Sequence, residues 1–127
     1  MANEQDCDRL YWRAVRIEKG SNCAAAGQGG VECGGPIGVH HVAGRANAVR
    51  FNTELGVCLC EQHHIGGRFS AHGTPKRFIE WWAEEFTEAY ITYCDLRRKI
   101  VSDRDMDYDA IKGELSEIVF GAPVFAD

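Results

Sequence analysis

"VHHVAGRANAVRFNTELGVCLCEQHH", Val39 to His64, contains four of the five histidines and two of the six cysteines of the chain. It holds two His-His pairs, and a Cys-Leu-Cys sequence comes just before the second pair. Imidazole and thiolate groups are the side chains that most often bind zinc and related divalent ions. The clustering therefore indicates metal binding, and it makes this stretch the centre of the fold.

Two short apolar runs, residues 37–42 and 55–59, predict the two strands of a hairpin. The connection from Ala43 to Glu54 would be a long polar loop, and loops of this length are often functional in compact domains. Successive residues of a strand point to opposite faces of a sheet. His40 and His41 are therefore not expected to bind the same ion, and we expect them to divide two roles between them.

A structural zinc site is predicted from the cysteines and the first histidine of the second pair. Two residues lie between Cys60 and His63, so one tight turn can present both side chains to a single ion. Cys23 and Cys33 would supply the other two ligands, and the spacer between them is longer than usual but rich in glycine and alanine. The alternative is that these are buried free cysteines that pack as small apolar side chains.

The remaining cysteines are assigned to packing. Cys58 would lie on the same strand face as Cys60 and could replace it as a ligand, but we favour a place in the core. Cys7 and Cys94 have no partner at metal-binding spacing and are interpreted as structural.

Helices are expected mainly in the second half of the chain. Residues 74–94 have apolar positions at helical spacing, with Thr74 as N-cap and Pro75 at the first helical position. A second helix is predicted over residues 110–120. Residues 7–20 mix helical and alternating patterns, so their type stays open, and residues 121–127 are expected to be extended or frayed.

The composition predicts one globular domain over residues 1–127, with 45% hydrophobic and 26% charged residues. Neither a signal peptide nor an apolar run of about 18–20 residues is visible, which favours a cytoplasmic protein, without a membrane partner, whose thiols stay reduced. The net charge of −5 argues against electrostatic coating of nucleic acid. Residues 40–77 are nevertheless mildly basic, whereas the acidic residues gather toward the ends.

The order Cys…Cys…"HHV"…Arg…"LGVCLCEQHH"…"FSAH" resembles the HNH endonucleases. It is most similar to a phage-type subgroup that includes recombination-enhancement nucleases, which suggests a bacterial or phage-encoded protein. The resemblance covers residues 23–82, with a helical extension over about residues 83–120. It implies an α+β fold in which a zinc-stapled ββα-metal (His-Me finger) core is flanked by helices.

The resemblance also implies a metal-dependent endonuclease that nicks or cuts DNA, mainly double-stranded and with little sequence preference. His41 would be the general base. His40 would bind a catalytic Mn²⁺, Ni²⁺, Mg²⁺ or Zn²⁺ ion, and His64, at the start of the helix of the unit, would be another ligand of that ion. His72 would complete that site or contact the scissile phosphate. Candidate phosphate contacts are Arg45, Arg50 and Arg68. The acidic C-terminal segment could join a second copy or another protein.

One departure from the family pattern concerns the asparagine that braces the loop behind the catalytic histidine. Leu55 occupies its usual position, and Asn52 would substitute only if the loop were rearranged. A degenerate, zinc-stapled module that binds nucleic acid or protein without catalysis is therefore the alternative to the nuclease.

Overall fold

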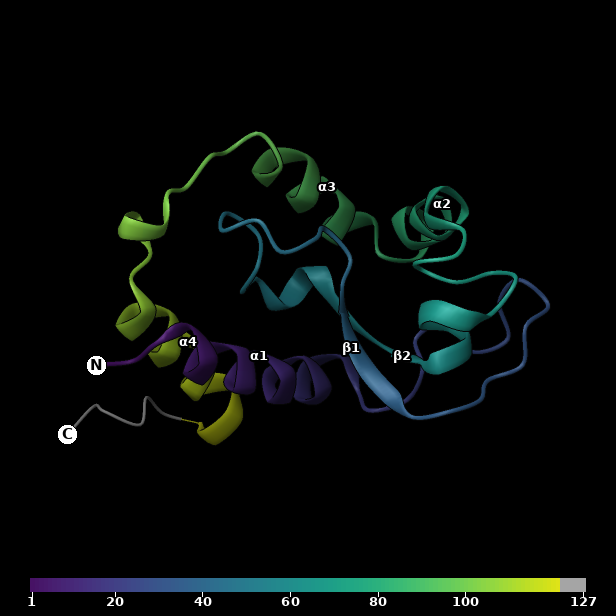
Figure 1. Cartoon of the computed structure of the whole chain (residues 1–127), viewed down its shortest axis with the longest axis horizontal. Helices are drawn as coiled ribbons and strands as arrows, with labels where there is room; N and C mark the ends of the chain where they lie inside the picture. Colours follow the sequence, from purple (N-terminus) through teal and green to yellow (C-terminus); the bar gives the residue numbers. More distant parts are fainter. Residues whose placement is uncertain (122–127) are drawn as a thin grey trace.

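A computed structural model describes residues 1–121 and shows helices arranged around a small sheet (Figure 1). The predicted extended tail falls almost wholly outside the described residues. In chain order, the elements are α1 (Glu4–Lys19), β1 (Ile37–His41), η1 (Thr53–Leu55), β2 (Gly56–Cys60), η2 (Gln62–Gly66), α2 (Pro75–Glu85), α3 (Thr87–Leu96), η3 (Asp103–Asp105) and α4 (Tyr108–Phe120).

The predicted hairpin is confirmed. β1 and β2 pair antiparallel, with His40 opposite Val57 and His41 opposite Gly56. The sheet has helices on both sides: α1 and α4 pack together along one face, and α2 and α3 lie beyond the other (Figure 1). Mixed helices with a small antiparallel sheet make an α+β fold.

All five residues of β2 are buried because both faces of the strand are covered. Val57 and Leu59 join a core with Phe78 and Trp82 of α2. Cys58 belongs to a second core, formed mainly by α1 and Leu115 of α4. The two cores explain why β2 reads as a continuous apolar run rather than as an alternating one.

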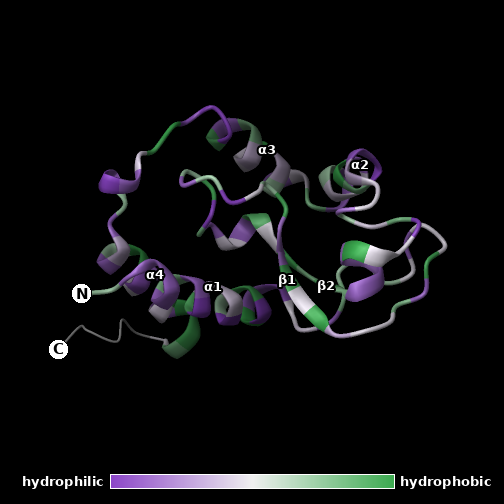
Figure 2. Ribbon diagram, in the orientation of Figure 1, coloured by the Kyte–Doolittle hydropathy of each residue, from purple (hydrophilic) through white to green (hydrophobic). Residues whose placement is uncertain are grey.

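Residues 4–19, for which the sequence left the type open, form the long helix α1. Asn3 and Asp6 close a reciprocal capping box at its start, with each side chain accepting a hydrogen bond from the backbone of the other. The helix carries apolar residues on one side and polar residues on the other, and Figure 2 shows both kinds along its ribbon. The apolar side meets the sheet and α4, so tertiary burial stabilises a helix that its local pattern leaves ambiguous.

The single helix predicted over residues 74–94 is in fact two helices. Pro75 begins α2 as expected, but Phe86 leaves the helical conformation (φ −121°, ψ 59°) and α3 starts at Thr87. The Thr87 hydroxyl donates to the Glu84 carbonyl, a local side-chain bond that competes with helical pairing. Thr74 is the N-cap residue of α2 as predicted, but its side chain makes no capping hydrogen bond, because its hydroxyl is bonded to the backbone of Ser70 instead. The helix predicted over residues 110–120 is confirmed as α4.

The helix that the resemblance implies at His64 is only one short turn in the structure. His63 and His64 lie in η2, a single π-helical turn that ends at Gly66. A stretch without regular helix follows, and α2 begins only at Pro75. The ββα-metal architecture implied by the resemblance therefore stays a proposal.

The loop after β1 is anchored to α1 through a buried guanidinium group. Arg50 is 8% exposed, and its two terminal nitrogens lie 2.6 Å from a Glu4 oxygen and 2.9 Å from an Asp8 oxygen. The neighbouring Arg45 reaches Asp8 at 3.5 Å. These ion pairs connect the predicted loop to a helix far away in the sequence.

Within the described residues, we find no helix with the length and apolar character needed to cross a bilayer.

Arg50→Met should reduce the free energy of unfolding by about 1–3 kcal/mol, because two carboxylates lose their partner while their own partial exposure limits the loss. Urea denaturation with zinc present measures the change. Arg98→Met, at an exposed position, is the matched control and should have little effect. Equal stability of the two variants would contradict the anchoring role of Arg50.

Candidate metal centres

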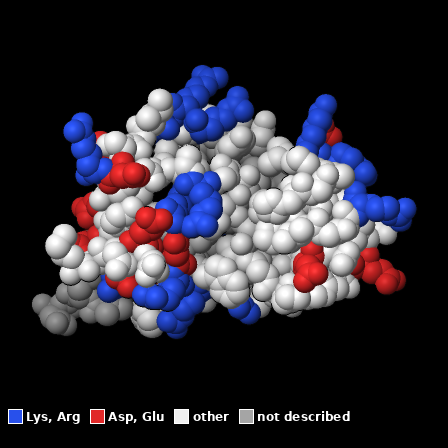
Figure 3. All heavy atoms as spheres, in the orientation of Figure 1, with Lys and Arg blue, Asp and Glu red and all other residues white. Residues whose placement is uncertain are grey.

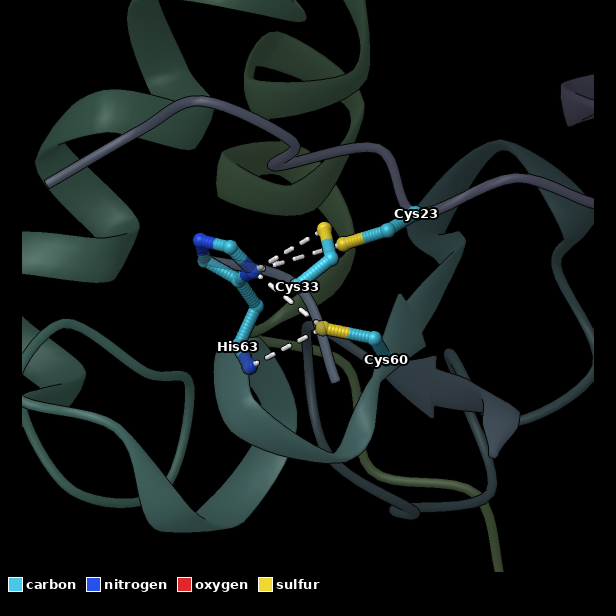
Figure 4. Close-up of side chains that lie close together, drawn as sticks. All are labelled: Cys23, Cys33, Cys60 and His63. Carbon is cyan, nitrogen blue, oxygen red and sulfur yellow. Dashed lines mark hydrogen bonds between the residues drawn. The ribbon is translucent and has the colours of Figure 1, made fainter. Parts of the chain in front are cut away.

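The four predicted zinc ligands converge. The Sγ atoms of Cys23 and Cys33 each lie 3.6 Å from Nδ1 of His63, and Sγ of Cys60 lies 3.2 Å from the same nitrogen. All four candidate ligand atoms are within 4.8 Å of one another. Figure 4 shows the four side chains pointing toward a common centre. This cluster could hold a structural metal ion such as zinc.

The spacing of the cluster fits tetrahedral zinc. With Zn–S near 2.3 Å and Zn–N near 2.0–2.1 Å, a tetrahedron places sulfur and nitrogen ligands about 3.6 Å apart. The three sulfur–nitrogen distances of 3.2–3.6 Å are close to this edge length. Three thiols and one imidazole are also a common donor set for structural zinc.

Local structure explains how the ligands meet. Cys60 ends β2 and His63 lies in the turn that follows, where its backbone N–H donates to Sγ of Cys60. Burial raises the pKa of Cys60, but hydrogen bonds with the backbone of His63 and Gly34 and with the side chains of His63 and Cys33 outweigh burial and lower this pKa to about 6. A thiolate ready to bind metal is thus favoured at this position.

The loop between α1 and β1 carries the other two thiols. Its backbone is bound to β2 where the Ala24 N–H donates to the carbonyl of Cys58 at 2.8 Å. Nε2 of His63 lies 3.2 Å from the carbonyl of Gln28, a contact that leaves Nδ1 free for a metal. Cys58 itself is buried against α1 in the second core, as favoured from the sequence.

A second cluster is made by the other predicted ligands, His40, His64 and His72. Their ring centroids are 4.9–5.1 Å apart, and Nε2 of His64 lies 3.2 Å from Nε2 of His72. Tetrahedral ligation by two imidazoles requires about 3.3 Å between nitrogens. One ring nitrogen from each residue lies within 4.8 Å of the others, so the three side chains could share an ion.

His41 points away from this cluster, as the alternation of β1 predicts. Its ring stacks on Tyr11 of α1, with centroids 4.8 Å apart and planes only 12° from parallel. Nε2 of His41 is buried, and no hydrogen-bond partner for it occurs within the described part of the chain. The rings of His40 and His41 therefore have different neighbours, although both residues line one cleft.

Three of the imidazoles, those of His40, His41 and His64, have a lowered pKa that favours the neutral form. Burial, and then the neighbouring His64 and His72, lower the pKa of His40 to about 3. Burial and then Arg45 lower the pKa of His41 to about 4. Burial and His72 also lower the pKa of His64. Neutral imidazole is the form that binds a metal or accepts a proton.

A cleft of about 420 Å³ opens between β1 and the start of α2. It is lined by both histidines of β1, by His64 and His72, by apolar residues such as Phe78, and by Arg45. The Arg45 side chain is 60% exposed and stands at this cleft. Figure 3 shows acidic side chains mainly in the left half of one face, with others at the lower right, and basic ones along the upper and right edges and also among the acidic ones.

The other two candidate arginines lie elsewhere. Arg68 is exposed beside Cys33 on the zinc-cluster side, so its phosphate contact stays a prediction. Arg50 is buried, and both terminal nitrogens are engaged by carboxylates. No local pattern indicated that acidic residues of α1 would neutralise Arg50, because those partners are more than 40 positions away in the chain.

The loop behind His41 is braced without an asparagine at position 55. Leu55 is 1% exposed and packs in the core. The Asn52 side chain instead caps η1 by accepting a hydrogen bond from the N–H of Glu54, and the backbone carbonyl of Asn52 accepts one from the Tyr11 hydroxyl at 3.0 Å. Tyr11 is thus a residue of the site that sequence reasoning missed, since only its helical spacing and aromatic character were visible.

Comparisons of the chain with family models, with curated proteins and with solved structures produced no match. The geometry of the two clusters therefore carries the functional argument.

Cys60→Ser should unfold most of the protein at 25 °C, because binding of structural zinc supplies folding free energy directly. Circular dichroism and elemental analysis measure the loss of helix and of one zinc ion per chain. Cys58→Ala, which changes a buried cysteine outside the cluster, should keep its zinc. A folded Cys60→Ser protein with full zinc content would rule out this ligand set.

Proposed function

We propose that the protein is a metal-dependent endonuclease that hydrolyses phosphodiester bonds of DNA. The observation that carries the proposal is the arrangement of β1: His40 meets His64 and His72 in a cluster of metal-binding spacing, while the adjacent His41 remains outside it as a neutral imidazole. A ligand set beside a separate potential base, at one cleft, is what metal-assisted hydrolysis requires.

The three clustered histidines would hold a divalent ion. Three imidazole ligands leave coordination positions open, as catalytic sites need, and suit Mn²⁺, Ni²⁺ or Zn²⁺ better than Mg²⁺. When bound, such an ion acts as a Lewis acid that stabilises negative charge on the phosphate and on the departing 3′ oxygen.

His41 would accept the proton of the attacking water. Its depressed pKa keeps the imidazole unprotonated at neutral pH, so the acceptor is present without prior loss of a proton. Arg45 would bind a phosphate of the backbone at the cleft, since its guanidinium is exposed and only loosely paired with Asp8. The zinc cluster would take no part in the reaction and would hold the loop and the turn that place His64.

The net charge of −5 is compatible with weak, non-specific DNA binding if the basic residues near the cleft act locally. The alternative is a zinc-stapled module that binds nucleic acid or protein without cutting. This alternative is favoured because Leu55, a buried core residue, occupies the position where the resemblance implies an asparagine. The two functions differ in their need for His41.

His41→Ala should reduce nicking of supercoiled plasmid by about 10²–10⁴-fold, because a positioned general base contributes a factor of this size. Its zinc content and melting temperature should stay near those of the wild type. The assay compares Mn²⁺, Ni²⁺, Co²⁺, Zn²⁺ and Mg²⁺. A zinc-loaded wild-type protein that leaves plasmid intact with every one of these ions would support the binding module instead.

Arg45→Ala should weaken DNA binding and lower the slope of log K against log salt by about 0.9, the effect of one lost phosphate contact on duplex DNA. Fluorescence anisotropy over a series of salt concentrations measures the slope. Arg104→Ala, an exposed arginine in the acidic η3 turn, is the matched control. Equal slopes for wild type and Arg45→Ala would exclude Arg45 from the interface.

A further inference from the structure

We infer that Tyr11, which α1 contributes from outside the histidine-rich segment, is a positioning residue for His41. The inference rests on the proposed function, because it concerns the same reaction. It begins with the geometry of the two rings, which stack almost parallel with their centroids 4.8 Å apart. One face of the His41 imidazole is therefore covered by an aromatic ring, which restricts rotation of the histidine side chain.

The Tyr11 ring is itself restrained by burial and by two contacts. It is 1% exposed, and Phe51 packs against it edge-on at 6.4 Å. Its hydroxyl donates to the carbonyl of Asn52 at 3.0 Å, where the loop between the strands turns into η1. Burial raises the pKa of Tyr11, so the phenol stays a hydrogen-bond donor. A restrained ring is a suitable support for a side chain that must keep one orientation.

Gly56 makes room for this contact. It is the residue opposite His41 in the hairpin, and a Cβ atom added there would overlap the Tyr11 hydroxyl. The backbone of Gly56 has an ordinary extended conformation (φ −110°, ψ 149°), so the glycine is required by space rather than by its dihedral angles. Strand pairing and the tyrosine together thus shape the pocket of His41.

Restraint of this kind matters for catalysis because a base must hold its proton-accepting nitrogen in line with the water. Displacement of a reacting group by about 1 Å can reduce a rate by about 10²-fold. Nε2 of His41 is buried and finds no hydrogen-bond partner within residues 1–121, so hydrogen bonding to this nitrogen does not orient the ring. The stacking contact with Tyr11 restrains the orientation of the ring instead.

The test compares Tyr11→Phe and Tyr11→Leu in the zinc-loaded full chain. Tyr11→Leu removes the stacking ring and should lower kcat for plasmid nicking by about 10- to 100-fold with little change in KM. Tyr11→Phe keeps the ring and should retain kcat within about threefold, so the conservative change rescues the rate. Leu115→Ala is the matched control, because Leu115 is 3% exposed in the same core cluster.

A second measurement is independent of activity. Stacking on Tyr11 should shift the ring protons of His41 upfield in the proton NMR spectrum, and the His41→Ala variant identifies these signals by their loss. The shift should persist in Tyr11→Phe and vanish in Tyr11→Leu. A purely structural role predicts instead that Tyr11→Leu and Leu115→Ala lose kcat equally.

The outcomes separate this inference from the proposed function. If the wild type nicks plasmid and His41→Ala does not, but Tyr11→Leu falls no further than Leu115→Ala, only the positioning role is overturned. The same holds if the upfield shift of His41 survives in Tyr11→Leu. If the wild type nicks no plasmid with any divalent ion, both the nuclease and the positioning role are overturned.

Discussion

The alternation of side chains along β1 is the constraint on which the arrangement of the site depends. Two adjacent histidines on a paired strand must face opposite ways, and helices cover both faces of this hairpin. His40 is therefore turned toward His64 and His72, and His41 toward α1. A shift of one residue in the strand register would exchange these surroundings and separate the three-histidine cluster.

The Cys/His cluster joins the loop between α1 and β1 to the end of β2. Residues 20–36 contain no helix or strand, and Ala25 packs this loop into the core. Cys23 and Cys33 lie together with Cys60 and His63 at the end of β2, and the hydrogen bond from the Ala24 N–H to the Cys58 carbonyl also holds this loop to the strand. A metal at this centre would fix η2, and with it the position of His64, the next residue along the turn.

α1 has two functions in the architecture. Its apolar side covers the face of the sheet that carries His41, and its carboxylates neutralise Arg50 in the loop between the strands. Two of the acidic residues of the chain are thus paired with one buried guanidinium group. This leaves Arg45, at the cleft, as the more accessible of the two loop arginines.

The sequence alone determined the hairpin, the start of α2, α4 and the Cys/His group of potential ligands, because strand patterns, turn spacing and donor chemistry are local properties. The group of three histidines was expected from the family resemblance rather than from spacing. It did not reveal that α1 is a helix, that Phe86 divides the predicted helix, or that His63 and His64 lie in an isolated π-turn. Only the tertiary structure decided that Arg50 is an anchor and that Tyr11 stacks on His41. Those outcomes come from contacts between segments 30 or more residues apart, and the burial that selects them leaves no periodic signal in either segment.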